Sequence, residues 1–102
     1  MIKIVIKRDV KTQKITKIEV KGHANSDVYG KDLVCAAVTT VLTGGMNALQ
    51  DKNYDFALKE GYILINSQNI PSDYDSVVLK TIETQLLTIE ESNHQYVRIE
   101  NL

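Results

Sequence analysis

The sequence predicts a single α+β domain, a layered sandwich in which a mostly antiparallel sheet packs with two helices. Three observations lead to this fold class. Several short stretches carry apolar residues at every second position, two longer stretches carry them at helical spacing, and these stretches follow one another in the order ββαββαβ. The chain of 102 residues fits one domain, 1–102, and shows no repeat, linker or low-complexity tract.

Alternation at the start of the chain predicts the first hairpin. Isoleucines stand at every second position over 1–7, with Val5 among the lysines on the other face, and the same alternation returns over 16–21 after the polar, turn-like stretch 8–13. The two stretches therefore predict antiparallel strands with one buried face. The lysines of this hairpin are expected on its solvent side, where they also form a group suited to contact RNA. They are Lys3, Lys7, Lys17 and Lys21.

The stretch from Asp32 to about Gln50 predicts the first helix, which is apolar on almost all sides and so largely buried. Asp32 is the candidate N-cap, because its carboxylate can accept hydrogen bonds from the first backbone N–H groups. The small and polar residues 22–30 before it predict a loop. Gly44 and Gly45 leave two alternatives open: they end the helix, or they allow another backbone to approach closely.

The remaining elements follow from the same two periods. They are a hairpin with strands at 54–59 and 62–66 joined by Glu60-Gly61, a helix after the N-cap candidate Ser72, and a last strand at 96–100. Asp75 stands at the third position of this second helix, which is typical of a capping pattern. The helix is amphipathic and is expected to lie over the sheet.

Charge and composition exclude several classes of protein. The chain has 12 basic and 13 acidic residues, and this near balance argues against direct coating of nucleic acid or of an anionic membrane. No apolar run approaches the roughly 20 residues of a membrane span, and residues 1–7 lack the apolar core of a signal peptide, so a cytoplasmic location is expected. One cysteine and two histidines allow neither an internal disulfide nor a Cys-rich zinc site, and no cofactor or metal is expected.

The single cysteine, Cys35, is the most informative residue. If Asp32 caps the helix, Cys35 lies in the first helical turn, where free N–H groups favour thiolate over thiol and can hold an oxyanion. The intervening loop can bring His23 beside the sulfur as a general base. Asp32 then either orients His23 or only caps the helix. The residues alone leave a second reading open, in which Cys35 is a small buried core residue.

Two motifs resemble the ribosomal-processing cysteine protease family, Prp. They are Gly22-His23-Ala24 and the segment 29–39, which reads YGKDLVCAAVT. The family pattern has a G-H-A segment, a short loop ending in Y-G-x-D, and then I/L-V-C-A-A. Chain length, the strand–strand start, the Gly-Gly-containing first helix and the late T-I-E segment also look like the family, so the resemblance covers essentially the whole chain.

The resemblance implies a Cys–His protease that removes the N-terminal extension of a large-subunit ribosomal protein. It places the nucleophile at Cys35 and the general base at His23. It matches Asp32 to the family aspartate, and Gly22 and Gly30 to its loop glycines. Thr39 stands where the family often has serine. The resemblance further implies cleavage after an aromatic residue, hence a hydrophobic subsite, and a homodimer. The alternative is a non-catalytic ribosome- or RNA-binding module that uses the hairpin lysines.

Overall fold

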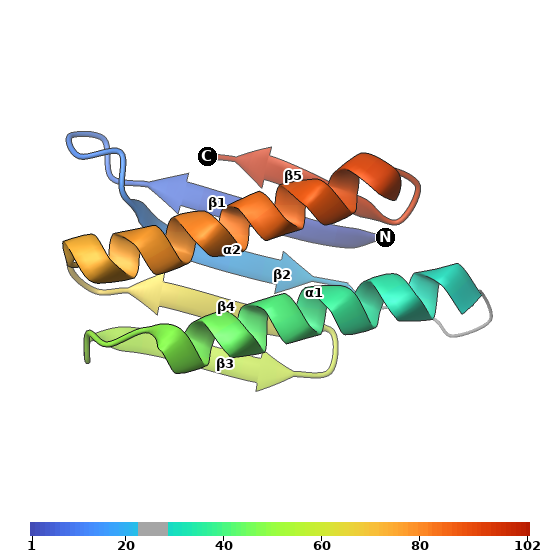
Figure 1. Cartoon of the computed structure of the whole chain (residues 1–102), viewed down its shortest axis with the longest axis horizontal. Helices are drawn as coiled ribbons and strands as arrows, with labels where there is room; N and C mark the ends of the chain where they lie inside the picture. The colour runs from blue at the N-terminus through green and yellow to red at the C-terminus, as the bar shows by residue number, and fades with distance from the viewer. Residues whose placement is uncertain (23–28) are drawn as a thin grey trace.

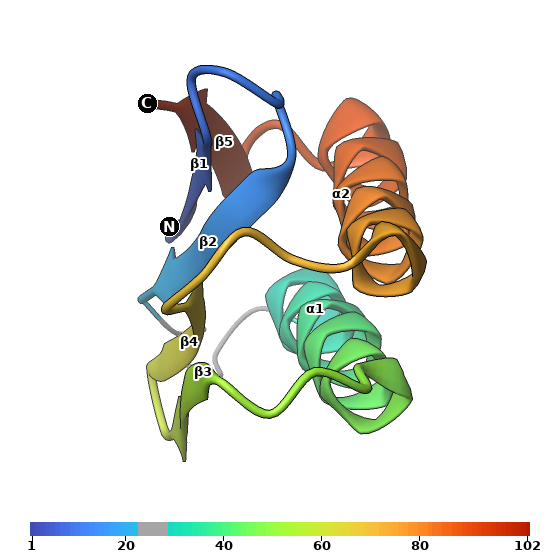
Figure 2. The ribbon, with the colours of Figure 1, turned by 90° about the vertical axis from the view of Figure 1, so that its left-hand side faces the viewer.

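The fold has two layers, a five-stranded sheet and a pair of helices that lie side by side across one of its faces (Figures 1 and 2). The computed structural model describes residues 1–22 and 29–102, and for residues 29–32 it describes the backbone only. The elements are β1 (Ile2–Arg8), β2 (Ile15–Lys21), α1 (Tyr29–Ala48), β3 (Tyr54–Lys59), β4 (Tyr62–Ser67), α2 (Asp73–Ser92) and β5 (Val97–Asn101). Their order is ββαββαβ, which confirms the predicted fold class.

The strands lie in the order β3-β4-β2-β1-β5. The pairs β1–β2, β2–β4 and β3–β4 are antiparallel, as predicted, whereas β5 runs parallel to β1, so the sheet is mixed. The reason is that α2 carries the chain back along the sheet, so β5 starts at the same end of the sheet as β1 (Figure 1).

One face of the sheet and the facing stripes of both helices form the core. The buried apolar residues are Ile2, Ile4, Ile6, Ile15, Ile18, Val20, Val34, Val38, Leu42, Ile63, Ile65, Leu79, Ile82, Leu86 and Val97. Because side chains alternate along a strand, the lysines between these residues lie on the opposite, uncovered face, where Lys3 is paired with Lys21 and Lys7 with Lys17. In the part of the chain that the structure describes, neither helix has the length and apolar character of a transmembrane segment.

The start of α1 corrects the sequence prediction. The helix begins at Tyr29, so Asp32 lies inside the helix and is not its N-cap, and Gly30 is a helical residue rather than a loop glycine. Local propensity does not favour this early start, because Gly30 costs about 1 kcal/mol relative to alanine and Asp32 is also a weak helix former. A cap-type residue alone therefore did not locate the start of the helix.

The start of α2 confirms the prediction. Ser72 is the N-cap, and its Oγ accepts a hydrogen bond from the backbone N–H of Asp75 at 3.1 Å. Asp75 is fully buried. Its carboxylate accepts hydrogen bonds from the backbone N–H groups of Gln50 and Asp51, at 2.9 and 2.8 Å, and from the hydroxyl of Tyr54 at 2.8 Å. Asp75 therefore joins the start of α2 to the segment between α1 and β3.

A second buried carboxylate, Glu83, joins α2 to the sheet. It is paired with Arg8 of β1 and, at 3.0 Å, with Lys80 one turn earlier on α2. Burial raises the pKa of Glu83, but the hydrogen bonds from Arg8 and Lys80 outweigh it, so the pKa lies below its ordinary value.

The two adjacent glycines of α1 have different surroundings. The helix continues through both to Ala48. A Cβ added at Gly44 would meet nothing within 4 Å, whereas one added at Gly45 would lie 2.2 Å from Cδ1 of Ile82. Gly45 therefore permits a close approach, as one of the two sequence alternatives proposed, but the approaching group is a side chain of α2 and not a backbone.

This difference provides a matched pair of variants. Both Gly44→Ala and Gly45→Ala gain the same helix propensity, about 1 kcal/mol, but only the second forces Ile82 out of its place. We expect Gly44→Ala to raise the free energy of unfolding. The free energy of unfolding of Gly45→Ala should be about 1–3 kcal/mol lower than that of Gly44→Ala. Urea denaturation of both variants measures the difference, and equal stabilities would show that Ile82 adjusts without cost.

Candidate active site

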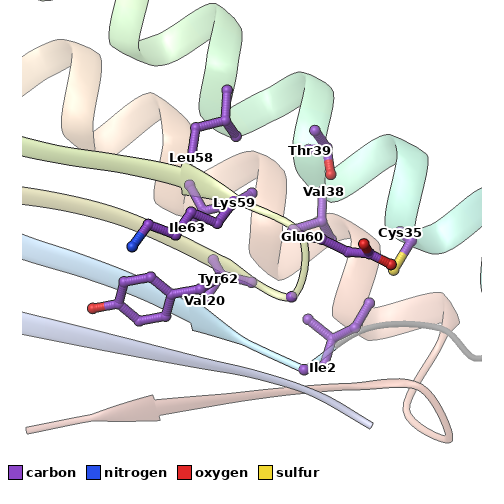
Figure 3. Close-up of a pocket in the computed structure, with 12 residues that line it drawn as sticks. Ile2, Val20, Cys35, Val38, Thr39, Leu58, Lys59, Glu60, Tyr62 and Ile63 are labelled. Atoms are coloured by element: carbon purple, nitrogen blue, oxygen red, sulfur yellow. The ribbon is translucent and has the colours of Figure 1, made fainter.

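A cavity of about 500 Å³ opens between the N-terminal half of α1 and the turn that joins β3 to β4 (Figure 3). Its lining is mostly apolar and includes the polar side chains of Thr39, Lys59 and Glu60. The lining residues are Ile2, Val20, Gly22, Cys35, Val38, Thr39, Leu58, Lys59, Glu60, Gly61, Tyr62 and Ile63. Helix, hairpin and the adjacent ends of β1 and β2 thus build one concave site.

Cys35 lies at this cavity, in the second turn of α1. Its neighbours Val34 and Val38 are buried in the core, while Leu33 is 54% exposed on the other side of the helix. Cys35 itself is partly buried: it packs against the core and also lines the cavity. The structure therefore excludes the reading in which the thiol is only an enclosed core residue.

The early start of α1 overturns one expectation about Cys35. The free N–H groups of a helix belong to its first four residues, which here are 29–32. The N–H groups around Cys35 have intrahelical acceptors one turn earlier, so they are not available to hold an oxyanion, and the electrostatic effect of the helix terminus falls off within the first turn. The predicted placement of Cys35 in the first turn is wrong because Asp32 is not the cap.

Gly22 is fixed at the cavity by its backbone. Its N–H donates to the carbonyl of Gly61 in the β3–β4 turn at 3.0 Å, and its φ is +99°. A Cβ at this position would lie 2.3 Å from the carbonyl oxygen of Met1, so only glycine fits. His23, the predicted general base, lies outside the described residues, as does the rest of the segment 23–28; its chain neighbour Gly22 lines the cavity.

Thr39 lies one turn after Cys35 on α1 and lines the same cavity. Two further residues of the site were not singled out from the sequence. Leu58, on β3, is 57% exposed and forms part of the wall, and Glu60, in the turn, points its carboxylate towards the side of the cavity where Cys35 lies (Figure 3). Only the spacing around Glu60-Gly61 signalled a turn, and nothing in the sequence indicated that this turn faces α1.

The side chain of Tyr62 points away from the cavity, onto the uncovered face of the sheet (Figure 3). Its hydroxyl donates to the carboxylate of Glu19 at 2.6 Å. This hydrogen bond lowers the pKa of Glu19 and raises that of Tyr62. Tyr62 therefore stabilises the pairing of β2 with β4 rather than offering a proton donor to the site.

A thiol that lines an apolar cavity, beside a glycine held by the β3–β4 turn and followed in the sequence by His23, defines a class of thiol-dependent hydrolase. Comparison with known proteins gives the family. The family model described as "Cysteine protease Prp" matches residues 1–98. The chain belongs to this family of cysteine proteases.

Relatives of known name agree with this assignment. The ribosomal processing cysteine protease Prp of Staphylococcus aureus is 34% identical over 93 residues, which cover 84% of this chain and 86% of the relative. The protein of the same name from Bacillus subtilis is 51% identical over 35 residues, which cover 34% of this chain and 31% of the relative.

Solved structures give the same result. The essential ribosomal processing protease Prp from S. aureus in complex with a substrate peptide has a TM-score of 0.89 and 29% identity, with both chains covered completely. The same protease with a covalently linked product peptide has a TM-score of 0.86 and 31% identity, again over both whole chains. These findings favour the protease over a non-catalytic RNA-binding module.

Proposed function

We propose that this cysteine protease removes the N-terminal extension of a large-subunit ribosomal protein during ribosome maturation. The observation that carries the proposal is the position of Cys35 at an apolar cavity large enough for a bulky side chain. The names of the relatives, and the complexes of the S. aureus protease with peptides, support a ribosomal protein as the substrate.

In the proposed reaction the thiolate of Cys35 attacks the carbonyl carbon of the scissile bond, with His23 holding the thiol proton. His23 then gives this proton to the amine of the leaving fragment as the C–N bond breaks, and a thioester to Cys35 remains. Water, deprotonated by His23, hydrolyses the thioester and regenerates the thiol. The cavity beside Cys35 holds an aromatic side chain that precedes the scissile bond, with Leu58 in its wall.

The supporting residues have smaller roles in this proposal. The hydroxyl of Thr39 lies on the same face of α1 as Cys35 and is placed to hydrogen bond near the reacting carbonyl. Gly22 and Gly30 flank the segment that carries His23, and Asp32 stands in the first turn of α1. Asp32 orients His23 in this proposal, since it is not the helix cap.

Incubation with a peptide that spans the extension and the first mature residues, read by mass spectrometry, tests the proposed function. We expect a single cut that depends on Cys35 and follows an aromatic residue. An intact peptide after prolonged incubation with wild-type protein would contradict the proposal, as would a cut that persists without the thiol.

We also propose that the protein is a homodimer that acts in the cytoplasm without binding nucleic acid directly. A solvent-facing groove of about 580 Å³ lies between α1 and α2 and offers a surface for contact between two copies of the chain. Tyr74 and Val77 on its α2 side are 54% and 67% exposed, and the groove is otherwise lined largely by small and apolar residues. The formal net charge of −1 supports the absence of nucleic-acid binding.

Val77→Lys tests the contact between copies, because it places a charge in the apolar groove. We expect sedimentation velocity to show a dimer for the wild type and monomers for Val77→Lys. The matched control is Val10→Lys, at a residue that is 87% exposed in the β1–β2 turn, which should remain dimeric. A dimer that survives Val77→Lys would place the interface elsewhere.

A further inference from the structure

The two outer strands of the sheet, β3 and β5, differ in whether the backbone groups on their free edges have hydrogen-bond partners. On β5, the outward N–H of Ile99 donates to the carboxylate of Glu90 at 2.6 Å, and the N–H of Val97 donates to the carbonyl of Asn93 at 3.0 Å. Both acceptors belong to the end of α2. The N–H groups of Val97 and Ile99 on this edge are therefore satisfied by the protein itself, which is a common protection against unwanted strand pairing.

The edge of β3 is open. The N–H of Gln68 donates to the carbonyl of Asn53 at 2.9 Å, and these two residues continue the register in which Tyr54 faces Ser67. In an antiparallel pair the hydrogen-bonded positions alternate, so residues 55, 57 and 59 bond to β4 while 54, 56 and 58 direct their N–H and C=O groups outward. No strand of the described ranges pairs with that side of β3.

The same residues carry exposed apolar side chains. Phe56 and Leu58 face the helix side of the sheet, opposite Ile65 and Ile63, yet they are 50% and 57% exposed. The ring of Phe56 stacks on that of Tyr54 with centroids 5.3 Å apart, which restrains its orientation. Backbone donors, backbone acceptors and apolar side chains are therefore presented together along one edge.

This edge is continuous with the candidate active site. Leu58 belongs both to the open edge and to the wall of the cavity that Cys35 lines. A polypeptide laid along β3 would therefore meet the wall of the cavity that Cys35 lines. Because proteases act on extended chains held in a fixed geometry, an edge that leads to the nucleophile suits a substrate strand.

We infer that the substrate polypeptide binds as an additional strand on the free edge of β3, with its backbone paired to Phe56 and Leu58 and its alternate side chains against theirs. This inference rests on the proposed protease function and adds where and how the substrate binds. Backbone pairing supplies affinity that does not depend on sequence, and Phe56 and Leu58 add a preference for apolar residues next to the cut.

A scan of backbone N-methylation tests strand addition. A fluorescein-labelled peptide spanning the cleavage point is titrated with the Cys35→Ala protein, and fluorescence anisotropy gives the dissociation constant of each singly N-methylated analogue. Only every second N–H of an added strand points to its neighbour, so we expect alternate analogues to bind at least about fivefold more weakly and those between them to bind normally. A pattern without alternation, or no measurable binding, would overturn the inference.

Variants of the edge test the side chains. Phe56→Ala and Leu58→Ala should each weaken peptide binding by about 5- to 10-fold, because each loses part of an apolar contact. Leu87→Ala is the matched control, at a leucine of α2 that is 44% exposed, and it should bind like the parent protein. Binding unchanged in the edge variants, with a shift from dimer to monomer in sedimentation, would instead assign the edge to a second copy of the chain.

Cleavage by the wild-type protein separates this inference from the proposed function. Cleavage that depends on Cys35, without an alternating methylation pattern, would refute strand addition alone. An alternating pattern without cleavage would refute the protease function for this peptide and leave the binding edge in place.

Discussion

Replacing Cys35 by alanine is expected to lower the rate of peptide cleavage by roughly 10⁴-fold or more, because the variant lacks the atom that forms the thioester. Single-turnover cleavage of the extension peptide, followed by mass spectrometry, measures the effect. The fold should survive the change, because Cys35 is only partly buried and alanine is a good helix former. Circular dichroism should therefore give the same helix content for both proteins.

A second variant distinguishes a nucleophile from a wall residue. Thr39→Val keeps the shape of a neighbouring cavity residue and removes only its hydroxyl. If Cys35 merely lined the cavity, Cys35→Ala and Thr39→Val would reduce cleavage by similar, small factors. We expect Thr39→Val to cost no more than roughly 100- to 1000-fold, the scale of one lost hydrogen bond to the oxyanion in a transition state. Cleavage by Cys35→Ala at the wild-type rate would exclude Cys35 as the nucleophile.

The fold could be predicted closely from the sequence because burial here follows simple periods. Isoleucines at every second position of β1 all face the helices, and Ser72 caps α2 through a local interaction with Asp75. The start of α1 could not be predicted as well. Asp32 has the chemistry of a cap, but the choice between a cap there and an extra turn depends on tertiary packing, which outweighs local propensity.

The candidate site also has residues that could be predicted from the sequence and residues that could not. Cys35 was identified from the sequence, as the single cysteine and as part of the family motif, and the structure places it at the cavity. Leu58 and Glu60 were not identified, because their role depends on the β3–β4 turn meeting α1, a contact between segments far apart in the chain. The open edge of β3 could not be predicted either, because strand order and the alternation of hydrogen bonds do not follow from a local sequence pattern.

Replacing Asp75 by alanine is expected to lower the free energy of unfolding by about 3–5 kcal/mol, a large part of the stability of a domain. The substitution leaves the backbone N–H groups of Gln50 and Asp51 and the hydroxyl of Tyr54 without their acceptor in a buried site. Asp75→Asn should also destabilise the fold, because an amide offers one acceptor oxygen where the carboxylate offers two. Urea denaturation measures both changes.

Asp73 provides the matched control, since it lies two residues earlier on α2 and its side chain is fully exposed beside Lys14. Asp73→Asn should change the free energy of unfolding little, because an exposed ion pair contributes little. If Asp73→Asn lowered the free energy of unfolding as much as Asp75→Asn, the stabilisation would come from negative charge near the helix N-terminus and not from the buried hydrogen bonds.

The pH dependence provides an independent check of the role of Asp75. Burial raises its pKa, but the hydrogen bonds from Gln50, Asp51 and Tyr54 outweigh burial, so the pKa lies below its ordinary value. The stabilisation is therefore fully present above the unfolded pKa of about 3.9 and is lost as the pH falls through the lower, folded value. The difference in stability between wild type and Asp75→Asn should accordingly shrink in acid. A difference that stays constant down to the lowest pH at which the protein folds would mean that the carboxylate acts through its shape and not through its charge.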